Sequence, residues 1–318
     1  MTITSGTHTF GAGGEYADLY AALVDIANEA VPPFPQINGD ITLVQVGDCD
    51  VNDLVSILPG YRSYGYKLTI TSDKPHYGET NKGWLINFNT SIYIDLQRFG
   101  NHEISGLNIK ATGNFIGFKI YIGYGAAELV AFRHDSTSKI YNNIFNCNNQ
   151  LNCSPFSFYN NSKKNAVLEL YRNKIFGHHL NMLAFDFAFS SGAFTNDYKV
   201  ENNSLYGDGV GMDCAPGVSD PPLILKNNAV YSPTQNCYRF GLNQEAYNNI
   251  SSDDTADDAP VQLDNYINAV FADEFKSLDP NNADFLKPVL GQNSSMSGVS
   301  QGISSNRFGI EGNPSPWS

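Results

Sequence analysis

Four residues in the middle of the chain have the types and the spacing that acid–base or metal chemistry requires. His178 follows an apolar segment, Asp186 comes soon after it, and Asp208 and Asp213 lie in the glycine-rich loop 207–214. Carboxylates placed in this way can act as the acid and base of a glycosidase, or as calcium ligands beside an arginine in a lyase. We therefore take these four residues as the candidate catalytic residues.

The alternation around Asp186 indicates which way its side chain points. Phe185, Phe187 and Phe189 share one face of a strand, and Asp186 lies on the opposite face. If the phenylalanines pack inside, Asp186 faces solvent. In a repetitive fold, however, every outward position stacks above its equivalent in the next repeat, so polar rows arise without catalysis. We expect this structural explanation to hold and assign no catalytic role on sequence alone.

An acidic turn is the other place where the sequence could bind a metal. It contains Asp253, Asp254, Asp257 and Asp258, but it lacks the spacing and the closing glutamate of a calcium loop. We expect a solvated loop there and no cofactor, with calcium as the alternative. The five cysteines are odd in number and include no CxxC pair, so we expect neither a disulfide framework nor a zinc site.

Charge and composition narrow the classes of ligand. The formal net charge is −13, whereas a nucleic-acid groove needs a basic stripe. Acidic polysaccharides are disfavoured too, because their carboxylates need basic partners. Neutral glycans remain compatible with this charge. Phe156, Phe158 and Tyr159 are aromatic residues that could form either a sugar platform or an interface patch, and the strand period does not determine which of them face outward.

A repeated motif gives the strongest structural signal in the chain. An apolar residue, two variable residues, an asparagine and an apolar or aromatic pair recur five times between residues 139 and 250. The key asparagines, 30, 30, 25 and 21 residues apart, are Asn143, Asn173, Asn203, Asn228 and Asn249. A unit with such a period predicts a solenoid, in which each coil buries its apolar face against its neighbours. Leu107 occupies the same slot 36 residues before Asn143.

The rest of the pattern is that of a β-protein with one helix. Residues 16–30 place apolar side chains at helical spacing, and Pro32 and Pro33 end the helix. Short strand-like segments follow, separated by turns rich in Gly, Asn, Asp and Ser. They cover residues 41–46, 67–71, 85–88, 92–96, 104–109, 118–122 and 129–132.

One amphipathic helix followed by an asparagine-marked strand array resembles the right-handed parallel β-helix of the pectate-lyase-like superfamily. The glycine-rich segment 10–16 resembles the entry that precedes the capping helix of that family. The five asparagines resemble its internal ladder, in which corner amides hydrogen-bond to backbone in their own coil and the next. The resemblance implies an all-β solenoid with an N-terminal capping helix and a mostly irregular C-terminal tail.

The two ends of the chain suggest how the solenoid is organised. We expect an N-terminal entry and cap helix in residues 1–35, the parallel β-helix in 36–256 and a tail in 257–318, all within one structural domain. The tail resembles the closing segment of bacteriophage and environmental β-helix proteins. Because open β-edges invite aggregation, we expect it to run back along the solenoid or to cover the last coil.

These features lead to a first hypothesis about function. The resemblance implies a bacteriophage virion structural protein, either a capsid decoration (cement) protein or a tail component, with other virion proteins as partners. Homotrimers are common among such proteins, so we expect a trimer or attachment to a symmetric shell. Contact with a surface glycan is a further expectation. The alternative is a polysaccharide-degrading enzyme, such as a tailspike depolymerase, a glycoside hydrolase or a lyase, and a third option is a glycan-binding adhesin.

The sequence also indicates where the protein is found. The first residues contain no basic n-region and no apolar h-region, so we expect no signal peptide. No apolar run approaches the length of a membrane span. We therefore expect synthesis in the cytoplasm of the host and assembly into the virion.

Overall fold

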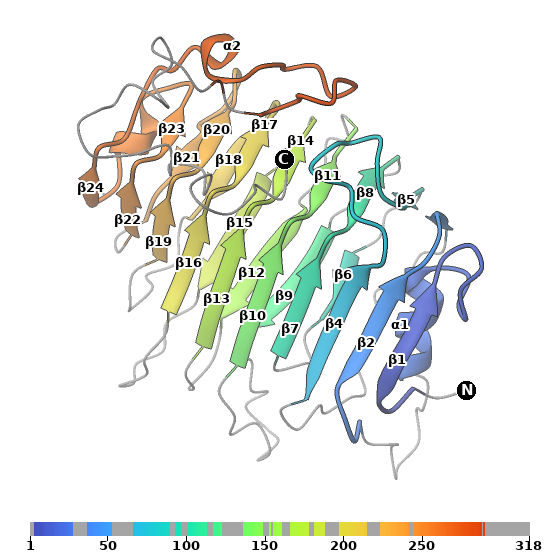
Figure 1. The fold of residues 1–318 in the computed structure, drawn as a ribbon. Helices are drawn as coiled ribbons and strands as arrows, with labels where there is room; N and C mark the ends of the chain where they lie inside the picture. Colours follow the sequence, from blue (N-terminus) through green and yellow to red (C-terminus); the bar gives the residue numbers. More distant parts are fainter. Residues whose placement is uncertain are drawn as a thin grey trace.

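The chain passes repeatedly through three parallel β-sheets, here called sheets A, B and C (Figure 1). The structure is a computed structural model. It describes residues 3–27, 37–52, 66–89, 93–96, 101–112, 117–122, 136–148, 153, 155–160, 166–177, 181–187, 197–214, 223–241, 244–287 and 289.

Each sheet contains one strand from each successive coil. Sheet A has 10 strands in the order β1 (Gly6–Phe10), β2 (Ile41–Gln45), β4 (Lys67–Ser72), β7 (Asn101–Ser105), β10 (Ser136–Tyr141), β13 (Ala166–Tyr171), β16 (Asp197–Glu201), β19 (Leu223–Lys226), β22 (Gln244–Tyr247) and β24 (Val261–Leu263). Sheet B has 8 strands, β23 (Ile250–Ser251), β20 (Ala229–Tyr231), β17 (Ser204–Tyr206), β14 (Lys174–Phe176), β11 (Ile144–Asn146), β8 (Asn108–Ala111), β5 (Leu85–Phe88) and β3 (Cys49–Val51). Sheet C has 6 strands, β21 (Tyr238–Arg239), β18 (Val210–Asp213), β15 (Asn181–Phe187), β12 (Phe156–Asn160), β9 (Gly117–Ile122) and β6 (Tyr93–Asp95).

The order of strands along the chain shows that these sheets are the sides of a solenoid. From β10 to β18 the chain visits sheets A, B and C in turn, three times. Each strand pairs in parallel with its equivalent one coil away, so that Ile140 lies opposite Leu170 and Leu170 lies opposite Val200. The chain is therefore an all-β parallel solenoid, as the spacing of the asparagines predicted.

Alternation along the strands separates the core from the surface. In β2, Ile41 and Leu43 are buried, and Thr42 and Val44, which alternate with them, lie on the outer face. Each coil adds such residues to one continuous interior core, in which Phe118 and Phe156 stack with ring centroids 5.7 Å apart. Burying a side chain of this size stabilises a fold by about 1.5–3 kcal/mol. All five cysteines are buried and free.

The corner between sheet A and sheet B explains the repeated motif. The residue just before each ladder position has a positive φ, between 53° and 70°, and these residues are Gly106, Asn142, Arg172, Asn202, Asn227, Asn248 and Asp264. This left-handed backbone costs most residues about 1–2 kcal/mol, but glycine, asparagine and aspartate adopt it more readily. The doubled asparagines of the motif therefore have different tasks: the first makes the corner and the second points inward.

The inward asparagines form a continuous ladder of hydrogen bonds. The Asn173 Oδ1 atom accepts bonds from the backbone N–H and the side-chain amide of Asn143, at 3.1 and 3.0 Å. The Asn173 amide in turn donates to the carbonyl of Ile140, at 3.1 Å. The same pattern joins Asn203, Asn228 and Asn249. Each asparagine thus satisfies a buried backbone N–H and a buried carbonyl of the preceding coil.

The ladder is longer than the sequence motif indicated. At one end, the backbone N–H of Leu107 donates to Asn143 Oδ1, at 3.1 Å. At the other end, Asn249 donates to Asn265 Oδ1 from its backbone, at 2.9 Å. The segment Leu263-Asp264-Asn265 carries the same signal as the earlier copies, but it lies beyond the boundary that we expected at residue 256. The solenoid continues at least to β24, which pairs with β22.

The N-terminal helix begins later than its periodicity suggested. Helix α1 (Leu19–Ala27) begins after Asp18, whose carboxylate accepts a bond from the N–H of Ala21 at 2.8 Å. It buries Leu19 and Leu23 against β1, β2 and β3, at the N-terminal end of the solenoid (Figure 1). Residues 28–36, with Pro32 and Pro33, and the expected strand 129–132 lie outside the described residues. The expected strand 104–109 is divided by the corner at Gly106 into β7 and β8.

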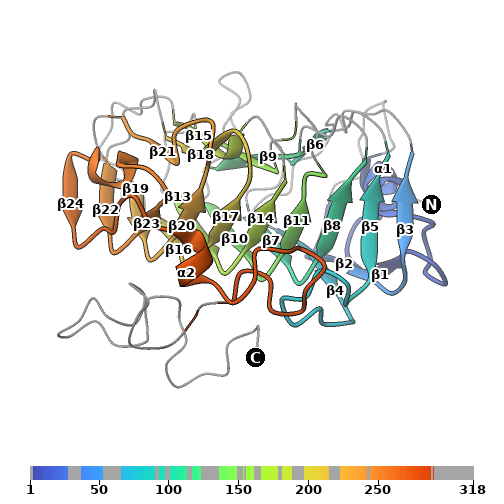
Figure 2. The same cartoon turned by 90° about the horizontal axis from the view of Figure 1, so that it is seen from above.

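The C-terminal part of the described chain leaves the last coil and crosses the outside of sheet B. After the short helix η1 (Thr255–Asp257) and β24, residues 269–287, here called the strap, include helix α2 (Phe271–Glu274). Figure 2 shows the strap running back over β20, β17 and β14. The carbonyl of Pro280 accepts a bond from the hydroxyl of Thr80, 200 residues earlier in the chain. No helix within the described residues is long and apolar enough to cross a membrane.

Candidate functional site

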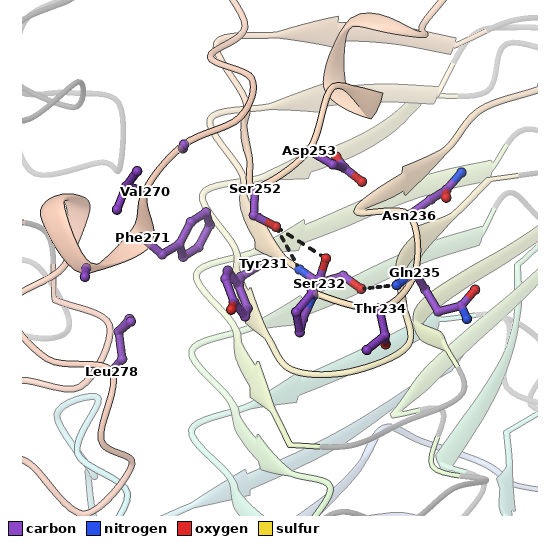
Figure 3. A pocket seen from close by; sticks show the side chains of 13 residues that line it. Tyr231, Ser232, Thr234, Gln235, Asn236, Ser252, Asp253, Val270, Phe271 and Leu278 are labelled. Carbon is purple, nitrogen blue, oxygen red and sulfur yellow. Dashed lines mark hydrogen bonds between the residues drawn. The ribbon is translucent and has the colours of Figure 1, made fainter.

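A cavity of about 610 Å³ lies between the strap and the turn that follows β20 (Figure 3). One wall belongs to the solenoid and the other to the strap. The lining residues are Tyr231, Ser232, Pro233, Thr234, Gln235, Asn236, Ser252, Asp253, Ala269, Val270, Phe271, Ala272 and Leu278. Concave sites with a mixture of apolar and polar side chains are the usual places where proteins bind small molecules.

Hydrogen bonds fix the turn that forms the polar wall. The Ser232 hydroxyl donates to the carbonyl of Gly209, at 2.6 Å, and accepts a bond from the N–H of Gln235, at 3.2 Å. The N–H of Ser232 donates to the hydroxyl of Ser252 in the next coil, at 3.1 Å. Thr234, Gln235 and Asn236 are exposed at this turn. Their hydroxyl and amide groups can both donate and accept hydrogen bonds, as recognition of a polyhydroxylated ligand requires.

The apolar part of the lining contains aromatic rings from both the solenoid and the strap. Tyr231 is half-buried and stacks on Tyr206, with ring centroids 4.7 Å apart and planes inclined by 19°. Phe271 of the strap lies 5.2 Å from the Tyr231 ring and is itself buried. Val270 remains 59% exposed at the rim. An aromatic surface beside amides and hydroxyls suits a ligand with both apolar and polar faces, such as a pyranose ring.

The single carboxylate of the cavity wall is engaged in structural hydrogen bonds. Asp253 accepts bonds from the N–H of Cys237, at 2.9 Å, and from the N–H and hydroxyl of Thr255, at 3.1 and 2.7 Å. Glycoside hydrolysis ordinarily uses two carboxyl groups, one on each side of the bond. The lining residues of this cavity therefore suit binding better than cleavage. Of the predicted acidic turn, Asp254, Asp257 and Asp258 are exposed.

The structure places two of the candidate catalytic residues on neighbouring strands of sheet C, because Asp213 of β18 lies opposite Ala184 of β15, two residues before Asp186. His178 lies outside the described residues. Asp186 is in β15, on sheet C, where its backbone lies opposite that of Tyr159. Asp208 precedes β18 and Asp213 is the last residue of that strand, where it forms an ion pair of 3.2 Å with Arg239. Neither Asp208 nor Asp213 lines the cavity next to the strap.

Two of the three aromatic residues considered for a sugar platform or an interface patch lie inside the solenoid. Phe156 and Phe158 are completely buried in the interior core. They point inward because alternate residues of β12 face the inside of the coil. The side chain of Tyr159 lies outside what the structure describes. The described residues also contain no group of three or more His, Cys, Asp and Glu side chains that could hold a metal ion.

Sequence reasoning missed a buried cluster of titratable residues beneath the strap. Lys174 is 1% exposed, and its Nζ atom donates to the carbonyls of Gly78, at 3.0 Å, and Phe285, at 2.6 Å. The pKa of Lys174 is lowered to about 7, mainly by burial and also by the nearby positive charge of Lys287, while Glu79 and Asp284 act in the opposite direction. A signal was available in the motif, since Lys174 occupies the slot that Ile144, Ser204, Ala229 and Ile250 fill in other coils.

Two buried histidines also have shifted pKa values. His76 lies next to this cluster, with its Nε2 atom 2.7 Å from the carbonyl of Asn142. His102 lies inside the solenoid, where its Nδ1 atom is 3.0 Å from the Ser138 hydroxyl and its Nε2 atom is 2.9 Å from the carbonyl of Leu96. Burial lowers the pKa of each histidine to about 4, so both are neutral near pH 7. The histidine–serine pair is sealed in the core, away from any substrate.

Comparisons with protein-family models, with curated proteins and with solved structures gave no match to this chain.

Proposed function

We propose that this chain is a structural protein of a bacteriophage virion, either a capsid decoration (cement) protein or a tail-associated component. In this proposal the solenoid is a right-handed parallel β-helix of the pectate-lyase-like type. Helix α1 caps its first coil, and the C-terminal tail, which includes the strap, covers the last coils. The partners are other virion proteins, and the expected assembly is a homotrimer or a symmetric attachment to the shell.

The observation that carries the proposal is the unbroken asparagine ladder from Leu107 to Asn265. In an ordinary solenoid, stability is a sum of contacts between neighbouring coils, so that coils can separate one at a time. Here, separating two coils also strips buried amides and carbonyls of their partners, at a cost of about 1–3 kcal/mol for each group. Such reinforcement suits a rod that must stay folded on the surface of a particle.

The outer face of sheet A supports the same proposal. Lys67 pairs with Glu103 and Lys139 pairs with Glu169, at 2.8 and 2.7 Å, each pair linking two adjacent coils. Tyr141 stacks on Tyr171 of the next coil, with ring centroids 4.9 Å apart. Exposed ion pairs stabilise only weakly on their own. Repeated along a face, they and the stacked rings fix the register of the coils and favour a stiff surface.

The cavity next to the strap favours contact with a neutral surface glycan. Its wall offers a stacking surface at Tyr231 and the amides of Gln235 and Asn236. The net charge of −13 disfavours an acidic polysaccharide at the same site. In this proposal the glycan is bound and not cut. Cleavage of a polysaccharide, with Asp186, Asp208 or Asp213 as the acid and base, is the competing function.

The location of the protein tests the proposal directly. Mass spectrometry of purified particles should find the chain at a fixed number of many copies per particle, and antibody labelling should place it on the capsid or the tail. Light scattering of the purified protein should give the mass of a trimer. Absence from particles would contradict the structural role.

A matched assay tests the competing enzyme. The wild-type protein is incubated with a panel of neutral and acidic polysaccharides, and release of reducing ends or unsaturated products is measured. The proposal predicts no turnover. Turnover that is lost in Asp186→Ala or Asp208→Ala, but retained in the exposed control Asp254→Ala, would establish the enzyme instead.

A further inference from the structure

The strap forms a second hydrophobic core that lies outside the solenoid. Four buried residues of sheet B and five of the strap make up this cluster: Ile144, Phe176, Ala229 and Ile250 from the solenoid, and Ala269, Phe271, Phe275, Phe285 and Leu286 from the strap. The interior core of the solenoid is a separate cluster. Removing the strap would therefore uncover the outer face of sheet B without opening the interior of the coils.

The strap is fastened to the solenoid in two chemically different ways. Aromatic contacts hold it over sheet B, where the Phe285 ring lies 4.8 Å from the Phe176 ring at a steep angle of 75°. Polar contacts hold it near the turn 73–84, where Thr80 donates to the carbonyl of Pro280 and Lys174 donates to the carbonyl of Phe285. Lys174 also donates to Gly78 of that turn, so its amine joins three segments of the chain.

The amine of Lys174 is the group that makes this attachment of the strap sensitive to pH. Placing a charged amine in a site of low polarity is costly, and two carbonyl oxygens compensate for this cost only in part. The titratable groups that face it are His76 and Glu79 from the turn, and Asp284 and Lys287 from the strap. When the strap leaves, Phe285 is removed from Lys174 and water can reach the amine.

We propose that residues 269–287 are a latch that opens from sheet B as one unit while the solenoid stays folded, and that protonation of the Lys174 amine favours opening. The latch also forms one wall of the cavity, through Ala269, Val270, Phe271 and Leu278. A ligand that contacts both walls binds only the closed form, and it therefore holds the latch shut.

The direction of the pH dependence follows from proton linkage. With the latch closed, burial lowers the pKa of Lys174 to about 7, whereas in the open form the amine returns towards its usual value near 10.4. Between these values the open form binds more protons, so closure strengthens as the pH rises. His76 titrates well below this window, since burial lowers its pKa to about 4 in the closed form.

Hydrogen exchange measured by mass spectrometry at pH 7 and pH 8.5, with correction for the intrinsic exchange rate, tests the proposal. The N–H of Ala269 in the strap donates to the carbonyl of Ser251 in the solenoid, so exchange at this amide reports on opening. Solenoid amides such as those of Lys174 and Ser204, bonded to the carbonyls of the preceding coil, are the internal reference. We expect the protection of the strap to be about fifteenfold lower at pH 7 than at pH 8.5, and that of the reference to be unchanged.

Three variants distinguish the latch from general loosening. Lys174→Met should abolish the difference between the two pH values, whereas Lys276→Met, at an exposed lysine of the strap, should preserve it. Phe285→Ala should lower the protection of the strap at both pH values and keep their ratio. The proposal is overturned if wild-type protection is the same at both pH values, if strap and solenoid exchange as one unit, or if Lys174→Met retains the dependence.

Discussion

The interior core of the solenoid and the second core beneath the strap are built by different rules. Inside, each residue meets its equivalent from the next coil, as Asn143 meets Asn173 30 residues later. Beneath the strap, Lys174 meets Phe285, 111 residues later, and Thr80 meets Pro280, 200 residues later. The first core is repetitive and cooperative along the rod. The second core occurs once along the chain and does not repeat. In our proposal it belongs to the part of the molecule that can move without unfolding the rest.

The two regions also satisfy buried polar groups differently. In the ladder, the partner of one asparagine is another asparagine, so neutral amides fill donors and acceptors together. Beneath the strap, an ionisable amine rests on two backbone carbonyls. A neutral network is insensitive to pH, whereas a buried amine is not. The rigid part of the protein is thus also the part that pH leaves unchanged near neutrality.

The largest effect is expected from placing a charge within the ladder. In Asn173→Asp, a carboxylate would replace the amide that donates to Ile140 and Tyr171 and to Asn203 Oδ1. An unpaired buried charge costs about 3–5 kcal/mol, so the apparent melting temperature should fall sharply. Because burial raises the pKa of such an aspartate, the loss should be smaller at low pH and grow as the pH rises. Wild-type melting would show that this slot is not buried in solution.

A smaller and more local effect is expected beneath the strap. Phe285→Ala removes a ring packed against Phe176 and Tyr206, which costs about 3 kcal/mol at a well-packed site. The loss should fall on the strap alone, so limited proteolysis should cut residues 269–287 while the solenoid retains its melting temperature. Val270→Ala, at an exposed residue, is the control. Equal destabilisation of both regions would remove the distinction between the two cores.

The end of the ladder should tolerate a change that its centre does not. Asn143→Leu deprives the N–H of Leu107 and the carbonyl of Ile104 of a partner. Asn173→Leu deprives both the N–H and the side-chain amide of Asn143, and also the carbonyls of Ile140 and Tyr171. The ladder position one coil before Asn143 is already a leucine, Leu107. We expect a loss of about 2 kcal/mol for Asn143→Leu and a larger one for Asn173→Leu, measured by chemical denaturation. The reverse order would show that the ladder is not cooperative.

The smallest effect is expected on the outer face of sheet A. Glu169→Gln removes the ion pair with Lys139, whose side chain is 43% exposed. Such a pair contributes about 0–1 kcal/mol and is weakened by salt. Melting in low and high salt should differ slightly for the wild type and not for the variant. A loss comparable to that of the ladder variants would mean that this face is covered in the assembled protein.

Particular residues show how far the sequence could be interpreted. The ladder position of Asn143, Asn173 and Asn203 could be predicted from the sequence, because a corner that recurs in every coil needs the same residue type each time. Asn265 carried the same signal and was missed because the spacing shortens to 16 residues in the last coil. The cavity was not predicted, since its two walls come from a turn after β20 and from the strap. His178, Asp186, Asp208 and Asp213 were selected by residue type and spacing, and of these Asp208 and Asp213 do not line that cavity.

The parallel solenoid could be predicted from the sequence alone. Strand alternation and the asparagine period reflect contacts between adjacent coils, and each coil repeats these contacts. The position of the strap, the burial of Lys174 and the cavity beside Tyr231 are visible only in the tertiary structure. Those features depend on how many coils separate two segments and on which outer face the chain returns across. Side-chain packing between distant segments leaves no period in the sequence, and it is this packing that lowers the pKa of Lys174 to about 7.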